Sequence, residues 1–144
     1  MIETNHFNGK VQKRCLPLFQ GAPPADAAGP KRLLLAQGEL AHFYDGEQGI
    51  RYAAFIELRT GGVRGNHWHR RKEEQIYVIS GELLLVAQNG ENGPRVSVSL
   101  KAGDLAIIAC GVYHALKTVE PGQAIEFSST RFDATDVQPF TLIT

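Results

Sequence analysis

Short strand-like runs separated by turn signals constrain the fold of this chain more than any other feature. Gly, Pro, Asn and Asp stand between these runs, as they do in the turns of β-rich proteins. The runs are residues 32–36, 40–44, 50–58, 63–69, 75–79, 82–88, 95–100, 104–109, 113–119 and 124–132. No segment keeps the period of about 3.6 residues that marks an amphipathic helix. The pattern predicts an all-β fold with little helix: a small antiparallel β-barrel or jelly-roll-like double-stranded β-helix.

Residues 20–30, QGAPPADAAGP, are dominated by Pro, Gly and Ala and are predicted to form a loop. We therefore expect residues 1–30 to be an N-terminal leader and loop, and residues 31–144 to form the β-barrel domain. At 144 residues the chain is long enough to bury a core without help from disulfides. Cys15 and Cys110 lie far apart with no CxxC spacing, so we interpret them as free thiols in a reducing cytoplasm.

The charge balance gives no argument for binding to nucleic acid or to an anionic membrane. The chain has 15 basic and 15 acidic side chains, so its formal net charge is zero. No apolar run approaches the roughly 18 residues of a transmembrane helix. The opening residues, MIETNHFNGKVQKRC, lack the apolar segment of a signal peptide. We expect a cytoplasmic protein whose ligand or substrate is a small molecule.

Four side chains offer the chemistry of a metal site. Successive side chains of a strand point to opposite faces, so His67 and His69 share one face. A short turn then lets the next strand present Glu74 to the same place, and His114 follows in a later strand-like run. Imidazole nitrogens and a carboxylate oxygen together suit iron, zinc, manganese or nickel. We predict one divalent transition metal ion per chain, held by these four residues.

The spacing of these residues resembles the first signature motif of the cupin superfamily. Gly61 is followed by five residues, the His67-Trp68-His69 triplet, four residues, Glu74, six residues and Gly81. The resemblance implies a small β-barrel that holds the metal ion inside.

A second stretch resembles the second cupin motif. It begins at Gly103, continues through Gly111 and His114, and ends at Thr118. Ala109 stands where the motif has proline, and Thr118 stands where it has asparagine. Both are turn or support positions, whereas all four ligand positions of the two motifs are kept. Together the motifs cover about two fifths of the chain.

A metal-dependent enzyme acting on a small polar metabolite is the function that these features favour. One subclass is an oxygenase, because a three-His, one-Glu centre looks like that of several dioxygenase cupins. The other is an isomerase or epimerase: the string RGNHWH and the tail FSSTRFDATDVQPF are similar to cupins associated with sugar-nucleotide isomerisation and epimerisation. A non-catalytic metabolite-binding or sensor cupin is the alternative, since a fold does not by itself determine function.

Several residues near the predicted ligands have less specific signals. An isomerase needs a base besides the metal ligands, and only His42 and Tyr44 are candidates. Glu73 is expected on the strand face opposite Glu74, in solvent. Arg64 and Asn66 precede the His pair, where side chains can reach the mouth of a barrel, and an arginine there can hold a carboxylate or phosphate.

Trp68 is expected to point out of the barrel because the histidines on either side of it point in. An outward tryptophan must be covered, either by the N-terminal leader or by a second subunit. Cupins resemble one another in pairing as dimers, and a free strand edge offers the means. We therefore predict a homodimer. Tyr77 and Tyr113 are also expected on the outer face.

Overall fold

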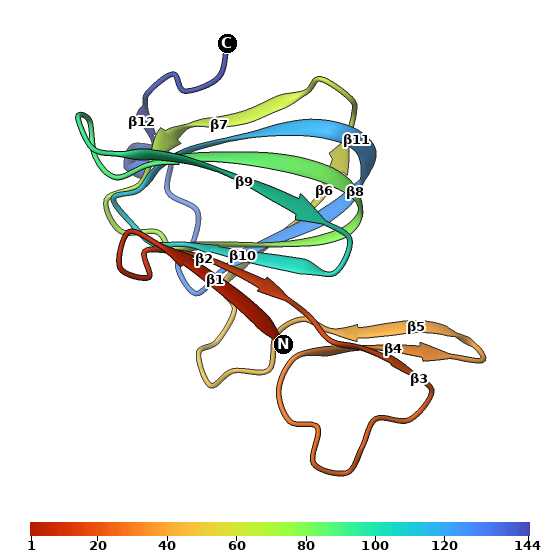
Figure 1. The fold of residues 1–144 in the computed structure, drawn as a ribbon. Helices are drawn as coiled ribbons and strands as arrows, with labels where there is room; N and C mark the ends of the chain where they lie inside the picture. The colour runs from red at the N-terminus through yellow and green to blue at the C-terminus, as the bar shows by residue number, and fades with distance from the viewer.

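The computed structural model describes residues 1–144 and consists almost entirely of β-strands (Figure 1). The strands are β1 (Ile2–His6), β2 (Val11–Cys15), β3 (Leu18–Gln20), β4 (Lys31–Leu35), β5 (Gly38–His42), β6 (Tyr52–Leu58), β7 (Val63–Trp68), β8 (Glu74–Gln88), β9 (Arg95–Lys101), β10 (Asp104–Ile108), β11 (Tyr113–Ser128) and β12 (Gln138–Pro139). A single 3-10 turn, η1 (Ala134–Asp136), lies near the C-terminus. No helix of the structure has the length and apolar character needed to cross a membrane.

Two long strands, β8 and β11, pair with each other and connect two layers of one nine-stranded sheet. In the first layer, the early half of β11 pairs with β7, which also pairs with β12, and the late half of β8 pairs with β9. In the second layer, the late half of β11 pairs with β6, and the early half of β8 pairs with β10, which continues to β2 and β1. These pairs are all antiparallel and confirm the jelly-roll-like, all-β class.

The pairing of β8 with β11 shifts in register where both strands pass from one layer to the other. The sequence predicts turns at Ser80-Gly81 and Pro121-Gly122, but the structure has irregularities inside two continuous strands. Gly81 has a φ of 84°, and a Cβ on it would lie 2.6 Å from the Glu120 carbonyl oxygen. The glycines therefore mark places where two backbones approach closely and the sheet changes direction.

The sheet does not close into a barrel, and in this respect the sequence-based expectation is wrong. The edge strands β9 and β12 of the first layer find no partner on β1 and β6, the edge strands of the second. Closure requires such a pairing. The molecule is a two-layer roll with open edges, as the ribbon in Figure 1 shows.

The segment before residue 31 contributes to the main sheet instead of forming only a leader. Strands β1 and β2 form a hairpin, and β2 pairs with β10 from Val11 to Cys15. Strand β3 pairs in parallel with β4, and β4 pairs with β5, in a separate three-stranded sheet. The Pro-rich loop connects β3 to β4, as expected for residues 20–30. This small sheet extends from the main body at the lower right of Figure 1.

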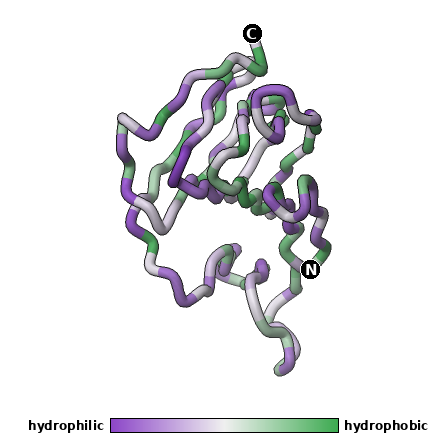
Figure 2. Tube along the Cα trace, turned by 90° about the vertical axis from the view of Figure 1, so that its left-hand side faces the viewer, coloured by the Kyte–Doolittle hydropathy of each residue, from purple (hydrophilic) through white to green (hydrophobic).

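Two apolar clusters stabilise the fold. Alternation of hydrophobic and hydrophilic residues along the strands, visible in Figure 2, places one face of each layer in the main core. That core takes side chains from both layers, such as Ile56 and Ile76 from one and Leu83 and Leu100 from the other. The second cluster lies on the outer face of the second layer. Its members are Leu16, Tyr77, Leu105 and Phe127, and Ala41, Phe43, Tyr44, Ile107 and Ile125 pack against it.

The role of Gly81 predicts a large effect of adding one methyl group. Gly81→Ala is expected to lower the free energy of unfolding by about 1–3 kcal/mol more than Gly90→Ala, because only Gly81 has a carbonyl in the path of the new Cβ. Both positions have a similar positive φ, of 84° and 87°, so the backbone cost is common to the two variants. Urea denaturation of the two variants measures the difference, and equal losses would contradict it.

Candidate metal centre

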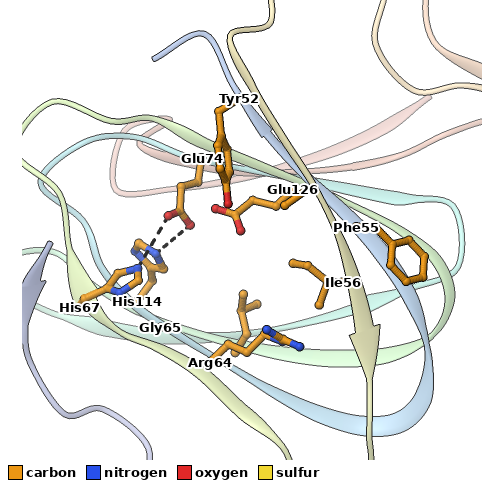
Figure 3. Close-up of a pocket in the computed structure, with 11 residues that line it drawn as sticks. Tyr52, Phe55, Ile56, Arg64, Gly65, His67, Glu74, His114 and Glu126 are labelled. Atoms are coloured by element: carbon orange, nitrogen blue, oxygen red, sulfur yellow. Dashed lines mark hydrogen bonds and ion pairs between the residues drawn. The ribbon is translucent and has the colours of Figure 1, made fainter. Parts of the chain in front are cut away.

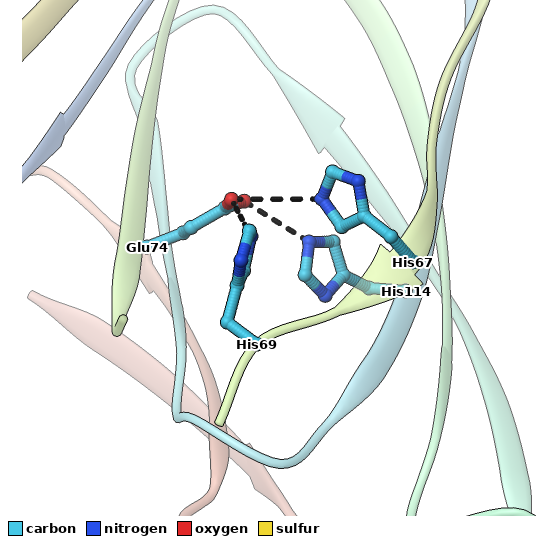
Figure 4. A group of neighbouring side chains, drawn as sticks. All are labelled: His67, His69, Glu74 and His114. Carbon is cyan, nitrogen blue, oxygen red and sulfur yellow. Dashed lines mark hydrogen bonds and ion pairs between the residues drawn. The ribbon is translucent and has the colours of Figure 1, made fainter. Parts of the chain in front are cut away.

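The structure brings His67, His69, Glu74 and His114 together (Figure 4). One ligand atom from each lies within 4.8 Å of all the others. His69, Glu74 and His114 are buried, with relative exposures of 3%, 4% and 1%, and His67 is half-buried. All four predicted ligands thus meet at one end of the space between the layers, and Glu73 is outside the group.

Three neighbouring strands place the four side chains. His67 lies in β7 directly opposite His114 in β11, and Glu74 opens β8. A register shift follows His114, and there Gly65, with a φ of 83°, packs against the β11 backbone. A Cβ on Gly65 would lie 2.9 Å from the His114 carbonyl oxygen. The glycine of the RGNHWH string therefore permits the close contact that sets the two histidines side by side.

The Glu74 carboxylate is the common partner of the three imidazoles. Its Oε1 atom lies 2.6 Å from His69 Nε2 and 3.7 Å from His67 Nε2, and its Oε2 atom lies 3.0 Å from His114 Nε2. Burial alone would raise the pKa of Glu74, but hydrogen bonds from the three histidines outweigh burial and hold this pKa well below its ordinary value. Glu74 is therefore an ionised carboxylate at neutral pH.

The other ring nitrogens of the buried histidines show that the group fits a cation. Nδ1 of His69 lies 2.7 Å from the Asp136 carbonyl oxygen, and Nδ1 of His114 lies 3.0 Å from the Val112 carbonyl oxygen. A carbonyl oxygen only accepts, so each Nδ1 donates its proton to that carbonyl, and Nε2 is the nitrogen that donates to the Glu74 carboxylate. A metal ion bound at Nε2 of each ring would take the place of the proton that is now donated to Glu74.

The donor set also fits a divalent transition ion in type and spacing. Zinc bonds to imidazole nitrogen and carboxylate oxygen at about 2.0–2.2 Å, so ligand atoms around one ion stand about 3–4.4 Å apart. The separations in the cluster range from 2.6 Å, between His69 Nε2 and Glu74 Oε1, to at most 4.8 Å, so binding of an ion would move those two atoms apart. The set contains no thiolate; both cysteines are free, and Cys110 is exposed. His67, His69, Glu74 and His114 are thus the residues that would hold the ion.

Asp136 fixes the loop that carries His69, and the sequence pattern did not reveal it. Its carboxylate accepts hydrogen bonds from the backbone amides of Arg70, Arg71 and Lys72, at 2.8, 3.2 and 3.2 Å. Its carbonyl accepts the bond from His69 Nδ1 described above. Burial would raise the pKa of Asp136, but the three amides outweigh burial and lower it. Asp133, which caps η1, was the only local signal for this turn.

A cavity of about 270 Å³ opens beside the cluster (Figure 3). Its other lining residues come mainly from β6, from β7 and from both halves of β11. They include Tyr52, Ala54, Ile56, Arg64, Leu116 and Glu126. The Tyr52 hydroxyl and the Glu126 carboxylate point into the same space as Glu74, whereas Phe55 points away (Figure 3). The cavity therefore has a carboxylate that is not one of the four ligands.

The bases suggested by the sequence, His42 and Tyr44, do not reach this cavity. His42 ends β5 of the small sheet, and Tyr44 packs edge-on against Phe127 on the outer face of the main sheet. The strand that ends at His42 belongs to a separate sheet, which the sequence could not reveal, and Tyr44 lies just beyond its end. The structure places Tyr52 and Glu126 in the cavity instead. Strand alternation gives a signal for Glu126, since its neighbour Phe127 faces the outer cluster.

Burial also perturbs Glu126. It raises the pKa of the Glu126 carboxyl, and the negative charge of Glu74 acts in the same direction. The Lys72 ammonium, 3.2 Å from Glu126 Oε1, opposes both effects. Arg64 lines the cavity from β7 and donates a hydrogen bond of 3.0 Å to the Glu57 carbonyl oxygen. The cavity thus contains both acidic and basic groups at its wall.

Trp68 lies on the outer face, as expected, but its neighbours differ from the expectation. It stacks on Tyr113 with ring centroids 5.1 Å apart, and the Arg70 guanidinium lies 5.9 Å from its ring. Phe140 of the C-terminal segment packs against Tyr113 at 4.7 Å. The leader does not cover Trp68, and no second subunit is needed to explain its position. The homodimer stays a prediction.

The C-terminal segment also reaches the site through Asn66. Its side chain accepts hydrogen bonds from the amides of Leu142 and Ile143 and donates one to the Ile143 carbonyl. Strand β12 pairs with β7 at Trp68 and His67. Asn66 was expected near the mouth of the cavity, but its side chain instead anchors the end of the chain. The C-terminal segment therefore supports the β7 strand that carries the first ligand.

Comparison with protein families gives one match that bears on this site. A family model described as a cupin domain matches residues 54–130, just over half of the chain. The matched range contains all four residues of the cluster and Glu126. A comparison with curated protein sequences gave no match.

Solved structures of low sequence identity share the fold. A dTDP-4-dehydrorhamnose 3,5-epimerase from Sulfolobus tokodaii aligns with a TM-score of 0.74 at 16% identity, over 96% of this chain and 81% of its own. A 3,4-ketoisomerase from Helicobacter canadensis aligns with a TM-score of 0.66 at 15% identity, over 75% and 84% of the two chains.

A third similar structure is a mutant 3,4-ketoisomerase from Thermoanaerobacterium thermosaccharolyticum in complex with TDP-4-keto-6-deoxyglucose. It aligns with a TM-score of 0.66 at 16% identity, over 75% of this chain and 81% of its own.

The geometry predicts that Glu74 and Glu73 differ sharply in metal binding. Glu74→Gln is expected to lose most of the bound ion, because the amide cannot supply the negative charge that faces the three imidazoles. Glu73→Gln is the matched control and is expected to keep one ion per chain. Elemental analysis of protein purified without a nickel column measures both. Loss in the Glu73 variant alone, or no ion in the unmodified protein after reconstitution, would contradict the assignment.

A second prediction concerns Asp136. Asp136→Asn removes one of the two carboxylate oxygens that hold the 70–72 loop, so His69 is less firmly placed. We expect the affinity for Co²⁺ to fall about 10–100-fold, as is typical when a residue that orients a ligand is lost. Asp26→Asn, at an exposed loop position, is the control. Titration calorimetry gives the two affinities, and equal values would show that Asp136 has no role in orienting His69.

Proposed function

The chain belongs to the cupin domain family, and from this premise we propose that it is a metal-dependent isomerase or epimerase acting on a small, sugar-derived ketone. One observation carries the proposal: Glu126, a carboxylate that is not a ligand, faces the same cavity as the four ligand residues. Moving a proton next to a carbonyl requires such a group. The similar structures are isomerases and epimerases by name, which supports the same reaction class.

His67, His69, Glu74 and His114 would hold the ion, and a bound divalent ion supplies a Lewis acid that polarises a carbonyl oxygen. The rest of the chemistry belongs to the chain. The buried position of the cluster excludes most water from the reacting carbonyl. Ile56 and Leu116 give the cavity an apolar wall, against which the carbon skeleton of a sugar can lie.

Glu126 is the group that accepts the proton in this proposal. Its Oε1 atom is engaged by Lys72, so Oε2 is the atom available to the substrate. Oε2 takes the proton from the carbon next to the carbonyl, and the C–H electron pair becomes the C=C bond of an enolate. The carbonyl π pair moves onto the oxygen. Return of the proton to a carbon restores a ketone, so atoms and charge balance without an oxidant or reductant.

Two outcomes of the proton return are open to these residues. When the carbon that loses the proton bears a hydroxyl, delivery by Glu126 to the former carbonyl carbon, on the same face, moves the carbonyl and gives an isomerase, and the hydroxyl proton passes to the former carbonyl oxygen. Delivery to the same carbon from the opposite face inverts it and gives an epimerase, which needs a second proton donor across the cavity from Glu126.

Size and polarity favour a sugar ring as the reacting part of the substrate. The cavity volume of about 270 Å³ is near the lower end of the range of about 300–1,000 Å³ for ligand sites. A single ring fits within it, and any further part of the substrate must extend past the mouth. Its wall includes Arg64, Glu126 and Tyr52, which suit hydroxyl and carbonyl groups.

An oxygenase gains nothing from a carboxylate that is not a ligand. Binding of oxygen needs open positions on the ion but no additional base, so the presence of Glu126 favours proton transfer. None of the similar structures described above is named as an oxygenase. A binding protein without turnover would have the same pocket, so a measurement of proton exchange separates the two.

The proposal predicts deuterium incorporation from D₂O into TDP-4-keto-6-deoxyglucose, the ligand named in a similar structure. Glu126→Gln is expected to slow this exchange by about 10²–10⁴-fold, the usual contribution of a general base, while the bound metal remains. Glu73→Gln, outside the cavity, is the control and keeps the exchange rate. Proton NMR under anaerobic conditions gives the rate and the labelled position.

The same experiment has outcomes that contradict the proposal. Binding of the sugar nucleotide without exchange would favour the non-catalytic alternative. Consumption of oxygen by the iron-loaded protein, with no exchange under anaerobic conditions, would favour an oxygenase. Label at the carbon that bore the original proton, with inverted configuration, indicates epimerisation, and label at the former carbonyl carbon indicates isomerisation.

A further inference from the structure

Lys72 is buried although it lies in the connection between β7 and β8. Its side chain has a relative exposure of 5%, whereas lysines are almost never fully buried unless paired. Arg70 and Arg71, its neighbours in the same connection, lie nearer the surface. The folded chain therefore directs one of three consecutive basic side chains inward, to the edge of the candidate metal centre.

The buried ammonium has three partners. Nζ lies 3.2 Å from Glu126 Oε1, 3.7 Å from Glu74 Oε1 and 4.2 Å from the centre of the Tyr52 ring. An ammonium without such partners is strongly destabilising in a protein interior. These contacts join a metal-ligand residue, the proposed base and an aromatic wall of the cavity through one side chain.

The backbone of Lys72 is also fixed. Its amide donates a hydrogen bond of 3.2 Å to Asp136 Oδ2, as part of the same set that holds residues 70 and 71. Phe132 and Tyr52 lie close together beyond the ammonium, with ring centroids 6.2 Å apart. Both ends of the side chain are therefore restrained, so Lys72 can in turn restrain the groups that it contacts.

Lys72 itself does not line the cavity. Its ammonium is instead engaged by the Glu126 and Glu74 carboxylates. Its contact with Glu126 is the one that bears on the reaction. The Glu126 side chain is flexible. Because the ammonium holds one of its carboxylate oxygens, the other oxygen points in a defined direction.

We propose that Lys72 is a positioning residue that holds Glu126 Oε1 and thereby aims Glu126 Oε2 at the substrate, at a fixed place relative to the metal ligand Glu74. This inference rests on the proposed function, because it assigns Lys72 a role in the proton transfer by Glu126. The same role applies to the protein without substrate: if the Lys72 ammonium is removed, the Glu126 carboxylate leaves its present position.

The test compares Lys72→Met with Lys31→Met. Lys31 is also buried, with a relative exposure of 9%, but it lies in β4 of the small sheet, away from the cavity. For Lys72→Met we expect kcat for the exchange of TDP-4-keto-6-deoxyglucose to fall about 100-fold, as for a misplaced catalytic group. KM should change less than about threefold, since Lys72 does not line the cavity. Lys31→Met should leave both constants unchanged.

A double-mutant cycle separates positioning from a general structural effect. If Lys72 acts through Glu126, then Lys72→Met added to Glu126→Gln should slow the residual exchange less than about threefold. A further 100-fold loss in that background would overturn the proposal. The Co²⁺ affinity and the visible spectrum of bound Co²⁺ should change little in Lys72→Met. If this variant does not fold, Lys72→Gln replaces it and keeps a polar group of similar length.

A crystal structure of Lys72→Met tests the positioning role of Lys72 separately from the proposed function. If the unmodified protein gives no exchange, the proposed function fails, but the position of Glu126 still tests Lys72. We expect the carboxylate to rotate away from the cavity toward solvent. A Glu126 carboxylate that keeps its place in the variant overturns the positioning role, whatever the activity of the unmodified protein.

Discussion

The contact between the Glu74 carboxylate and three imidazoles is the constraint on which the arrangement of the strands around the site depends. It joins β7, β8 and β11 at the end of the roll where the apolar core stops. Ionised and neutral polar groups buried at one point destabilise a fold unless each has a partner. The partners here come from the backbone: the carbonyls of Asp136 and Val112 fix the tautomers of two rings. The C-terminal turn is therefore as much a part of the site as the strands that supply the ligands.

The ligand set could be predicted from the sequence because its signals are local. His67 lies in β7, His69 lies one residue beyond its end, and Glu74 opens the next strand after a short turn, so the local sequence brings them close together. The partners of Glu126 could not be found in this way. Lys72 lies 54 positions earlier in the chain, and its contact depends on the register of β11 after the irregular pairing near Gly81. A shift of one residue there would exchange Glu126 with Phe127.

The same physical reason explains where the expected architecture differs from the observed one. Ser80-Gly81 and Pro121-Gly122 have turn composition, but the two pairs lie close together in adjacent strands, so they bend the sheet without ending the strands. Residue pairs of turn composition indicate an unusual backbone conformation, and such a conformation occurs at an irregularity within a strand as well as at a chain reversal. His42 and Tyr44 were candidates because their strand had no assigned face. Strand β5 belongs to a separate sheet because it pairs with residues 31–35, and this pairing could not be read from the residues of β5 themselves.

The charges around the cavity bear on which reaction the site can stabilise. Glu74, Glu126, Lys72 and Arg64 together carry no net charge when the imidazoles are neutral. A bound divalent ion would make the total charge positive. Such a site stabilises a substrate that becomes negative during the reaction more than one that stays neutral, because the interaction acts in a buried, weakly screened space. Loss of a proton next to a carbonyl creates that negative charge beside Glu126, the carboxylate that Lys72 holds.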